Sequence, residues 1–215
     1  MRREAQGTQG PFNLIIAGVG GQGTIFASQV VARAAMQEGF SVRIAETYGV
    51  TQRGGPVYSQ VRIGRQVYGP LIPKGCCRLI MGLEPIEALR RAADYLAPGG
   101  SVVINTHVNV PLETQLGRQP DLRFETIEQQ LRKLGAGELL AVDARAMAEA
   151  AGGVATTNVL MLGAMCGLDI FPLSYKSVES AVRAATRPRF LDANLMSLDT
   201  GRQYALAIKN TDRKK

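Results

Sequence analysis

The fold is decided by residues Asn13–Ala45, which read NLIIAGVGGQGTIFASQVVARAAMQEGFSVRIA. The apolar run 13–17 predicts a strand, and the glycine-dense turn 18–23 follows it at once. Residues 24–38 carry apolar side chains at helical spacing, a glycine then ends the helix, and residues 40–45 read as a second strand. A strand, a glycine turn, a helix and a strand form a β-α-β unit, which predicts a parallel sheet.

The same alternation continues to residue 153, with one interruption. Alternating apolar residues at 57–63 and again at 67–68 follow a polar loop, and they predict a β-hairpin insertion whose turn lies around Gly64–Arg65. Beyond it the pattern predicts strands at 79–82, 101–105 and 139–143, and helices at 84–96, 125–134 and 144–151.

The strands stop after Gly152-Gly153. Helices are expected at 156–167, 174–186 and 188–208, the last broken near 200–201. The fold class is therefore α/β, with a Rossmann-like, mostly parallel sheet flanked by helices, a β-hairpin insertion and a helical C-terminal third. We expect one domain over residues 13–209, with flexible ends at 1–12 and 210–215.

The cysteine and histidine content argues against a metal centre in this chain. The three cysteines, Cys76, Cys77 and Cys166, are too few for a disulfide framework or a four-thiolate iron–sulfur cluster. The single histidine, His107, leaves a zinc site short of ligands. We expect no metal here, and we expect any redox metal to sit on another polypeptide.

The charge is basic but dispersed. The 215 residues include 25 Lys and Arg against 18 Asp and Glu, a net charge of +7, with no basic helix stripe and no Trp. This pattern argues against nucleic-acid binding and fits an acidic partner or a phosphate-bearing ligand, although a basic solvated surface explains it as well. No apolar run reaches the roughly 20 residues that cross a bilayer, so we expect a cytoplasmic protein.

The glycine turn matches the pattern G-x-G-x-x-G between a strand and a helix, which predicts contact with a phosphate or pyrophosphate. Glycines allow a close backbone approach, and N–H groups at a helix start attract anions. The alternative is a tight corner in which the glycines only permit strand–helix packing. The candidate cofactor-binding residues here are Gly18, Gly20, Gly21, Gln22, Gly23 and Thr24.

A second polar segment follows the strand at 40–45, where open α/β sheets place their ligands. Its arginine offers a planar fork of donors for a carboxylate or phosphate, and the next two glycines expose backbone amides. The alternative is a polar surface loop. The candidates are Arg53, Gly54 and Gly55 for cofactor binding, and Glu46, Tyr48 and Thr51 as site-lining residues.

Four further residues have competing interpretations. His107 follows a strand, where it is either a general acid or base or simply a loop residue. Glu84 and Glu87 begin a helix, where capping is the expected role. Asn158 lies near a helix start, where it either caps the helix or lines the site.

The two motifs, GVGGQGTIFAS at 18–28 and ETYGVTQRGGPVYSQVRIG at 46–64, resemble the gamma-type domain of the pyruvate/ketoisovalerate oxidoreductase superfamily. Within that group the chain is most similar to the indolepyruvate ferredoxin oxidoreductase beta subunit. Further matches, which extend the resemblance over roughly 13–209, are 83–88, 98–103, Thr157-Asn158 and Leu162-Gly163.

The resemblance implies the small subunit of an enzyme that is active only as a complex. Such an enzyme oxidatively decarboxylates a 2-oxoacid, passing the acyl group to coenzyme A and the electrons to ferredoxin. Thiamine diphosphate and iron–sulfur clusters would belong to a larger partner subunit. Homodimerisation is left open.

Two other functions compete with this interpretation. One is a stand-alone dinucleotide-binding oxidoreductase, and the other is a scaffold subunit that contacts no ligand. Within the family, indolepyruvate, pyruvate, a branched-chain oxoacid and an arylglyoxylate all remain candidate substrates.

Overall fold

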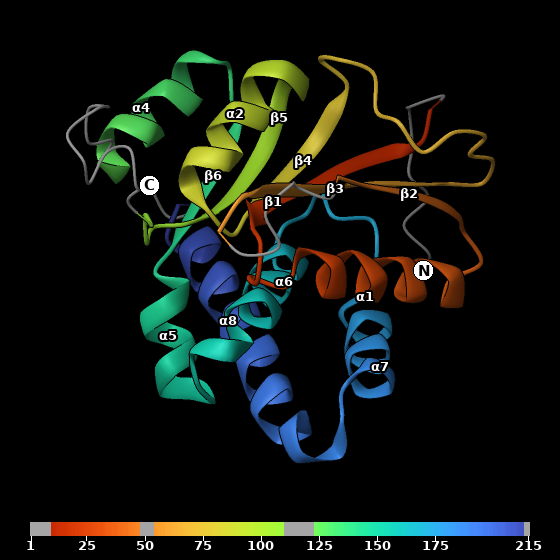
Figure 1. Ribbon diagram of the computed structural model, residues 1–215, viewed down its shortest axis with the longest axis vertical. Coiled ribbons are helices and arrows are strands. Elements are labelled where there is room, and N and C mark those ends of the chain that lie inside the picture. Colours follow the sequence, from red (N-terminus) through yellow and green to blue (C-terminus); the bar gives the residue numbers. More distant parts are fainter. Residues whose placement is uncertain (1–9, 48–53, 110–122, 213–215) are drawn as a thin grey trace.

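The computed structural model describes residues 10–47, 54–109 and 123–212, and these form a six-stranded sheet between two layers of helices (Figure 1). The strand order is β2-β3-β1-β4-β5-β6. The strands are β1 Phe12–Val19, β2 Ser41–Thr47, β3 Pro56–Gly64, β4 Cys77–Gly82, β5 Leu96–Asn105 and β6 Glu138–Val142. The helices are α1 Thr24–Gln37, α2 Pro85–Tyr95, α4 Phe124–Lys133, α5 Ala144–Ala151, α6 Thr157–Cys166, α7 Tyr175–Ala185 and α8 Leu191–Asp212. Two short 3-10 turns, η1 Val154–Thr156 and η2 Pro188–Phe190, precede α6 and α8.

The predicted α/β class is confirmed, and most of the sheet is parallel. β1 pairs with β4, β4 with β5 and β5 with β6 in parallel register, whereas β3 runs antiparallel to both β1 and β2. The run 13–17 is buried throughout because β1 lies in the middle of the sheet with helices on both faces.

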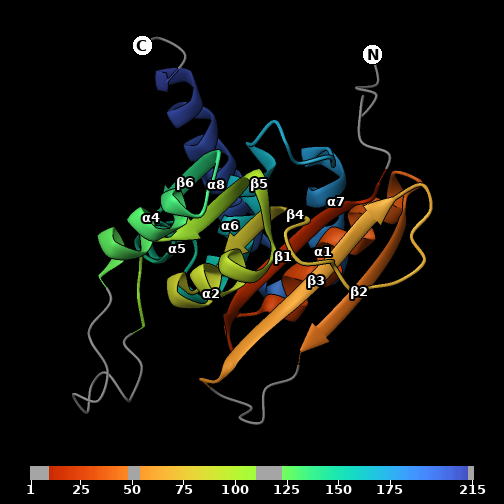
Figure 2. The same ribbon diagram turned by 90° about the horizontal axis from the view of Figure 1, so that it is seen from above.

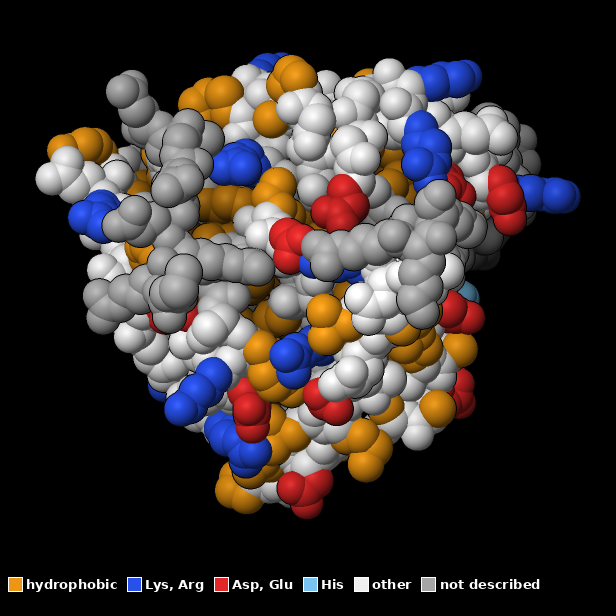
Figure 3. Space-filling view, turned by 180° about the vertical axis from the view of Figure 1, so that it is seen from behind, with side chains coloured by type: hydrophobic (Ala, Val, Ile, Leu, Met, Phe, Trp, Pro, Cys, Tyr) orange, Lys and Arg blue, Asp and Glu red, His pale blue; other side chains and the backbone are white. Residues whose placement is uncertain are grey.

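The two faces of the sheet support two separate hydrophobic cores. Leu14 and Ile16 point to the face covered by α1 and the C-terminal helices, and Ile15 and Ala17 point to the face covered by α2 and α4. Among the described elements, no helix covers β2 and β3 on the α2 side (Figure 2). Space-filling atoms show acidic and basic side chains interspersed over one face of the molecule (Figure 3).

The predicted position of the hairpin turn was wrong. A hairpin is present, but β2 and β3 form it, so its connection lies at 48–55 and not around Gly64–Arg65. β3 already has β1 on one side and β2 on the other, so no edge is left for residues 67–68 to pair with. Val67 is nevertheless buried, with 5% of its surface exposed. Its apolar side chain therefore serves burial and not strand pairing.

The break predicted near 200–201 is also absent, because α8 runs unbroken through Gly201. A Cβ atom on Gly201 would overlap the backbone oxygen of Leu160 in α6, and one on Gly163 would overlap the backbone oxygen of Leu198 in α8. These glycines let the two helix backbones approach closely, so they serve packing and do not end a helix.

The three cysteines are free. Burial raises the pKa of Cys77 and of Cys166 to about 12, so both thiols stay protonated at neutral pH. Within the described ranges, no cluster of three potential metal ligands occurs, and no helix has the length and apolar character to cross a membrane.

Candidate functional site

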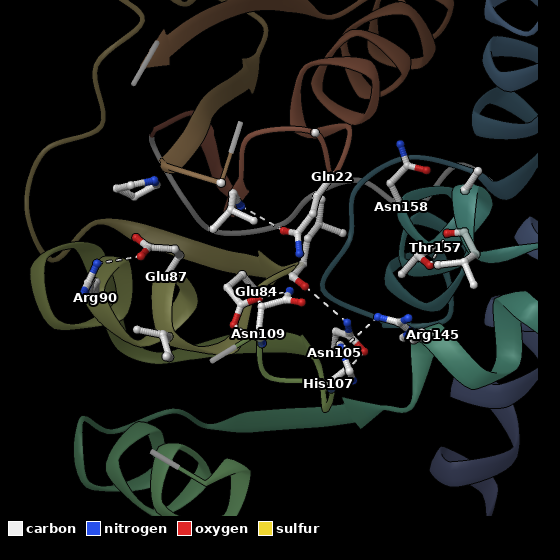
Figure 4. A pocket seen from close by; sticks show the side chains of 18 residues that line it. Gln22, Glu84, Glu87, Arg90, Asn105, His107, Asn109, Arg145, Thr157 and Asn158 are labelled. Carbon is white, nitrogen blue, oxygen red and sulfur yellow. Dashed lines mark hydrogen bonds and ion pairs between the residues drawn. The ribbon is translucent and has the colours of Figure 1, made fainter. Parts of the chain in front are cut away.

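A cavity of about 750 Å³ opens where the central parallel strands end (Figure 4). Val19 ends β1, Leu83 follows β4 and Asn105 ends β5, and all three residues line this cavity. The first turn of α6 contributes Thr157 and Asn158 from across the cavity. The position agrees with the general rule that open α/β sheets bind ligands beyond the carboxyl ends of their strands.

The glycine turn folds back on itself at one side of this cavity. The backbone N–H of Gln22 donates to the Val19 carbonyl at 3.1 Å, and the Val19 N–H donates to the Gln22 side-chain oxygen at 2.9 Å. Gly21 and Gly23 have φ angles of 99° and 80°, which residues other than glycine rarely adopt. A Cβ on Gly18 would lie 2.6 Å from the Gln22 Oε1 atom, so that glycine makes room for the Gln22 side chain.

Gly54 and Gly55, at the end of the second polar segment, lie beside the glycine turn. The Gly20 N–H donates to the Gly55 carbonyl at 2.9 Å, and the Gly54 N–H donates to the Gly20 carbonyl at 3.3 Å. The amides of Gly20, Gln22 and Gly54 therefore donate to protein carbonyls, and the side chains of the cavity become the better candidates for ligand donors. Three further predicted site residues, Tyr48, Thr51 and Arg53, lie outside the described residues.

Asn158 ties the first turn of α6 to the glycine turn. Its side-chain N–H donates to the Gly23 carbonyl at 3.3 Å, while its Oδ1 atom accepts the backbone N–H of Val159 at 2.9 Å. A Cβ on Gly23 would overlap the Asn158 amide, so Gly23 is required by contact as well as by backbone angle. Thr24 is buried with 5% of its surface exposed, and it is not among the residues that line the cavity.

Glu46, another predicted site-lining residue, does not line this cavity. Its Oε1 atom accepts a hydrogen bond from the Ser28 hydroxyl of α1 at 3.2 Å. β2, which carries Glu46, is separated from β1 by the antiparallel strand β3. The acid that follows the second strand is therefore one strand further from the glycine turn than in a dinucleotide-binding fold, where the first two strands are neighbours.

Two carboxyl groups form another wall of the cavity. Glu84 has 2% of its surface exposed, and burial raises its pKa above the ordinary value, although hydrogen bonds from Asn109 and Gln22 oppose the shift. Burial also raises the pKa of Glu87, against the opposing effect of Arg90, whose guanidinium lies 2.7 Å from the carboxylate.

His107, in the segment after β5, meets Arg145 of α5 at the cavity. Arg145 Nη1 lies 3.0 Å from His107 Nε2. A guanidinium only donates, so Nε2 accepts, and the ring proton of a neutral His107 is then on Nδ1. Asn105 supports this segment, because its Oδ1 atom accepts the N–H groups of His107 and Ala144, both within 3.3 Å.

The sequence interpretation undervalued Glu84 and His107. Glu84 was expected to cap α2, yet its carboxylate makes no hydrogen bond to that helix and turns to Asn109 instead. Both residues follow parallel strands, Glu84 after β4 and His107 after β5, and this position was the available signal. The cavity thus combines the Glu87 carboxylate with donors from Arg145 and Asn158, which suits a ligand with both donor and anionic groups.

Comparison with known proteins shows which family the chain resembles. The family model described as pyruvate ferredoxin/flavodoxin oxidoreductase matches residues 13–204. The indolepyruvate oxidoreductase subunit IorB of Pyrococcus horikoshii is 37% identical over 93% of this chain and 98% of its own length. The IorB subunit of Archaeoglobus fulgidus is 38% identical over 91% of this chain and 96% of its own length.

A solved structure shows the same fold. The gamma subunit of a keto/oxoacid ferredoxin oxidoreductase from Geobacter sulfurreducens superposes with a TM-score of 0.66 at 24% identity, covering 91% of this chain and 99% of the other. The family model spans both the glycine turn and the start of α6, which together build the cavity. The chain belongs to the pyruvate ferredoxin/flavodoxin oxidoreductase family.

Proposed function

We propose that the chain is the small subunit of a 2-oxoacid:ferredoxin oxidoreductase acting on indolepyruvate or a related 2-oxoacid, and that its cavity forms one wall of a site shared with a larger subunit. The observation that carries the proposal is the meeting of the glycine turn, Gly54-Gly55 and the start of α6 at one cavity. The IorB relatives are themselves subunits, and this chain matches them over nearly their whole length.

The redox cofactors belong to the larger subunit in this proposal. Thiamine diphosphate supplies a carbanion sink when it is bound, and iron–sulfur clusters carry electrons one at a time. The described residues offer no group of three metal ligands, and the chain has three cysteines. These residues do not fit a cluster, nor the divalent ion that accompanies a diphosphate.

Coenzyme A is the ligand that we assign to this chain, as a cosubstrate. Its phosphates need donors, and Arg145 and Asn158 offer a guanidinium and an amide at one side of the cavity. The Arg53 side chain, although outside the described residues, belongs to the segment that leads to Gly54. Ferredoxin is the proposed electron acceptor, and the cytoplasm is the proposed location.

The test is co-expression with the large subunit, followed by a screen of 2-oxoacids for coenzyme A-dependent reduction of a viologen dye. We expect activity from the complex and none from either subunit alone. Arg145→Ala should raise the KM for coenzyme A about tenfold, as expected when a charged hydrogen bond is lost. Arg183→Ala on α7, which removes an exposed ion pair with Glu179, is the matched control. A large subunit that is fully active alone would refute the proposal.

The same measurements separate the competing functions. A scaffold subunit predicts that neither Arg145→Ala nor Arg53→Ala changes the KM for coenzyme A. A stand-alone dinucleotide enzyme predicts that the isolated chain binds a nicotinamide or flavin cofactor in a titration. The position of β3 between β1 and β2 argues against the second of these.

A further inference from the structure

Glu84 is a side chain of the cavity wall on which several hydrogen bonds converge. Its carboxylate accepts the backbone N–H of Asn109 at 3.2 Å and 3.3 Å from the two oxygens, and it also accepts the Asn109 side-chain amide. The side-chain amide of Gln22 forms a further hydrogen bond to it. These partners come from opposite sides, because Gln22 follows β1 and Asn109 follows β5 (Figure 4).

The burial of Glu84 decides what kind of role it can have. With 2% of its surface exposed and its oxygens already bonded, its carboxylate offers a ligand little contact. Gln22 and Asn109 both line the cavity, and both are held by Glu84. Gln22 in turn accepts the Val19 N–H, so the bonds run from the end of β1 to the segment after β5.

We propose that Glu84 is a positioning residue of this site: its carboxylate fixes Gln22 and Asn109, and through them the cavity wall that meets coenzyme A. The inference rests on the proposed function for the identity of the ligand. The hydrogen-bonded arrangement itself does not, so it is testable on this chain alone.

The chemistry of the carboxylate makes the proposal specific. An ionised carboxylate is an acceptor with about four lone-pair sites, which suits the N–H groups that converge on it. Glutamine has the same shape but one carbonyl oxygen and an NH₂ group, which would face other donors. If Glu84 only fills space, Glu84→Gln should have little effect. If its carboxylate accepts the N–H groups around it, Glu84→Gln should disturb the residues that donate them.

The first experiment measures steady-state kinetics of the complex with Glu84→Gln and Glu84→Ala. We expect each substitution to raise the KM for coenzyme A about tenfold and to leave kcat within about twofold, since the side-chain amides of Gln22 and Asn109 lose the acceptor that positions them. Glu179→Gln, the same chemical change on the surface of α7, should leave both constants unchanged. A Glu84→Gln complex with the KM of the wild type would overturn the proposal.

A double-variant cycle provides a second kinetic test. Asn109→Ala removes one of the donors that Glu84 holds, so we expect it to raise the KM for coenzyme A by about threefold. In combination with Glu84→Gln, the increase should be smaller than the product of the two single increases, because the residues act through one contact. Independent, multiplicative effects would contradict the proposal. Asn109→Ala also keeps the test available if Glu84→Gln does not fold.

A third experiment, by NMR, uses the full chain without its partner and does not depend on enzyme activity. We expect the side-chain amide protons of Gln22 and Asn109 to exchange slowly with solvent in the wild type, as measured by NMR. They should exchange at least about tenfold faster in Glu84→Gln, while the β1 backbone amides keep their protection. Unchanged exchange would overturn the inference. An inactive complex with the expected exchange pattern would instead refute the proposed function alone.

Discussion

Two sets of glycines in this molecule serve different purposes. Gly163 and Gly201 lie inside helices where α6 and α8 cross, and each faces a backbone oxygen of the other helix. Gly18 and Gly23 belong to the glycine turn, and there the nearest atoms belong to the side chains of Gln22 and Asn158. One set lets two backbones touch, and the other makes room for polar side chains.

The difference separates stability from function within one fold. The crossing belongs to the larger core below the sheet, which includes apolar residues of α6 and α8. The glycine turn lies at the carboxyl edge, where the neighbouring groups are amides and carboxyls. We therefore expect substitutions at the crossing to lower stability, and substitutions at the turn to alter the cavity as well.

The largest effect is expected at the crossing. Gly201→Ala places a Cβ atom against the Leu160 carbonyl, and the helices have to move apart to admit it. We expect a loss of about 3 kcal/mol in the free energy of unfolding, because overpacking exceeds the roughly 1 kcal/mol that alanine gains in helix propensity. Chemical denaturation of the isolated chain measures this.

Gly163→Ala tests whether the two glycines act as one contact. The double variant should lose less than the sum of the two single losses, because one displacement of α8 admits both methyl groups. Coenzyme A affinity of the complex should change little while the chain stays folded. A net gain of stability in either single variant would show that the helices have room to spare.

A smaller loss of stability is expected at the turn. Gly23→Ala puts a side chain at a φ of 80° and against the Asn158 amide, and we expect about 2 kcal/mol of destabilisation. The KM for coenzyme A should rise as well, because Asn158 lines the cavity. Adding Asn158→Ala removes the steric part only, so the double variant should regain some stability but not the KM. If Gly23→Ala changes stability alone, the proposed contrast between the two regions is wrong.

The smallest expected effect is a pH dependence of the unfolding free energy that comes from Glu87 in the cavity wall. Burial raises the pKa of Glu87 above its ordinary 4.5, so the folded chain holds this proton more tightly than the unfolded chain. The protonated Glu87 carboxyl stabilises the folded chain fully at a pH below the pKa that Glu87 has in the unfolded chain. This stabilisation is lost as the pH rises through the higher pKa that Glu87 has in the folded chain. The unfolding free energy of the wild type, relative to Glu87→Gln, should be greater at about pH 4 than at about pH 8. The reverse order would mean that the ion pair with Arg90 outweighs burial.

The sequence predicted most of the fold from local patterns. Apolar periodicity located all six strands and every helix of eight or more residues that the structure describes, within a few residues at most ends. The two errors, a hairpin turn at Gly64–Arg65 and a break near 200–201, have a common cause. Each depends on which element lies alongside: β1 and β2 on the two edges of β3, and α6 against α8.

The candidate site shows the same limit. The glycine turn was predicted from its motif and Asn158 from its place at a helix start, whereas Glu84 was read as a helix cap and His107 as either a loop residue or a catalytic one. Their place at the cavity depends on β4 lying next to β1 and β5 lying next to β4, which spacing along the chain does not reveal.

By itself the sequence determined the α/β class, the family motifs and the glycine turn, because helix and strand periods and glycine-dense turns are local properties of the chain. Only the tertiary structure decided that β3 separates β1 from β2, that mid-helix glycines serve a helix crossing, and that Glu84 holds Gln22 and Asn109. These features depend on contacts between residues far apart in sequence, and burial sets their energies only once the chain has folded.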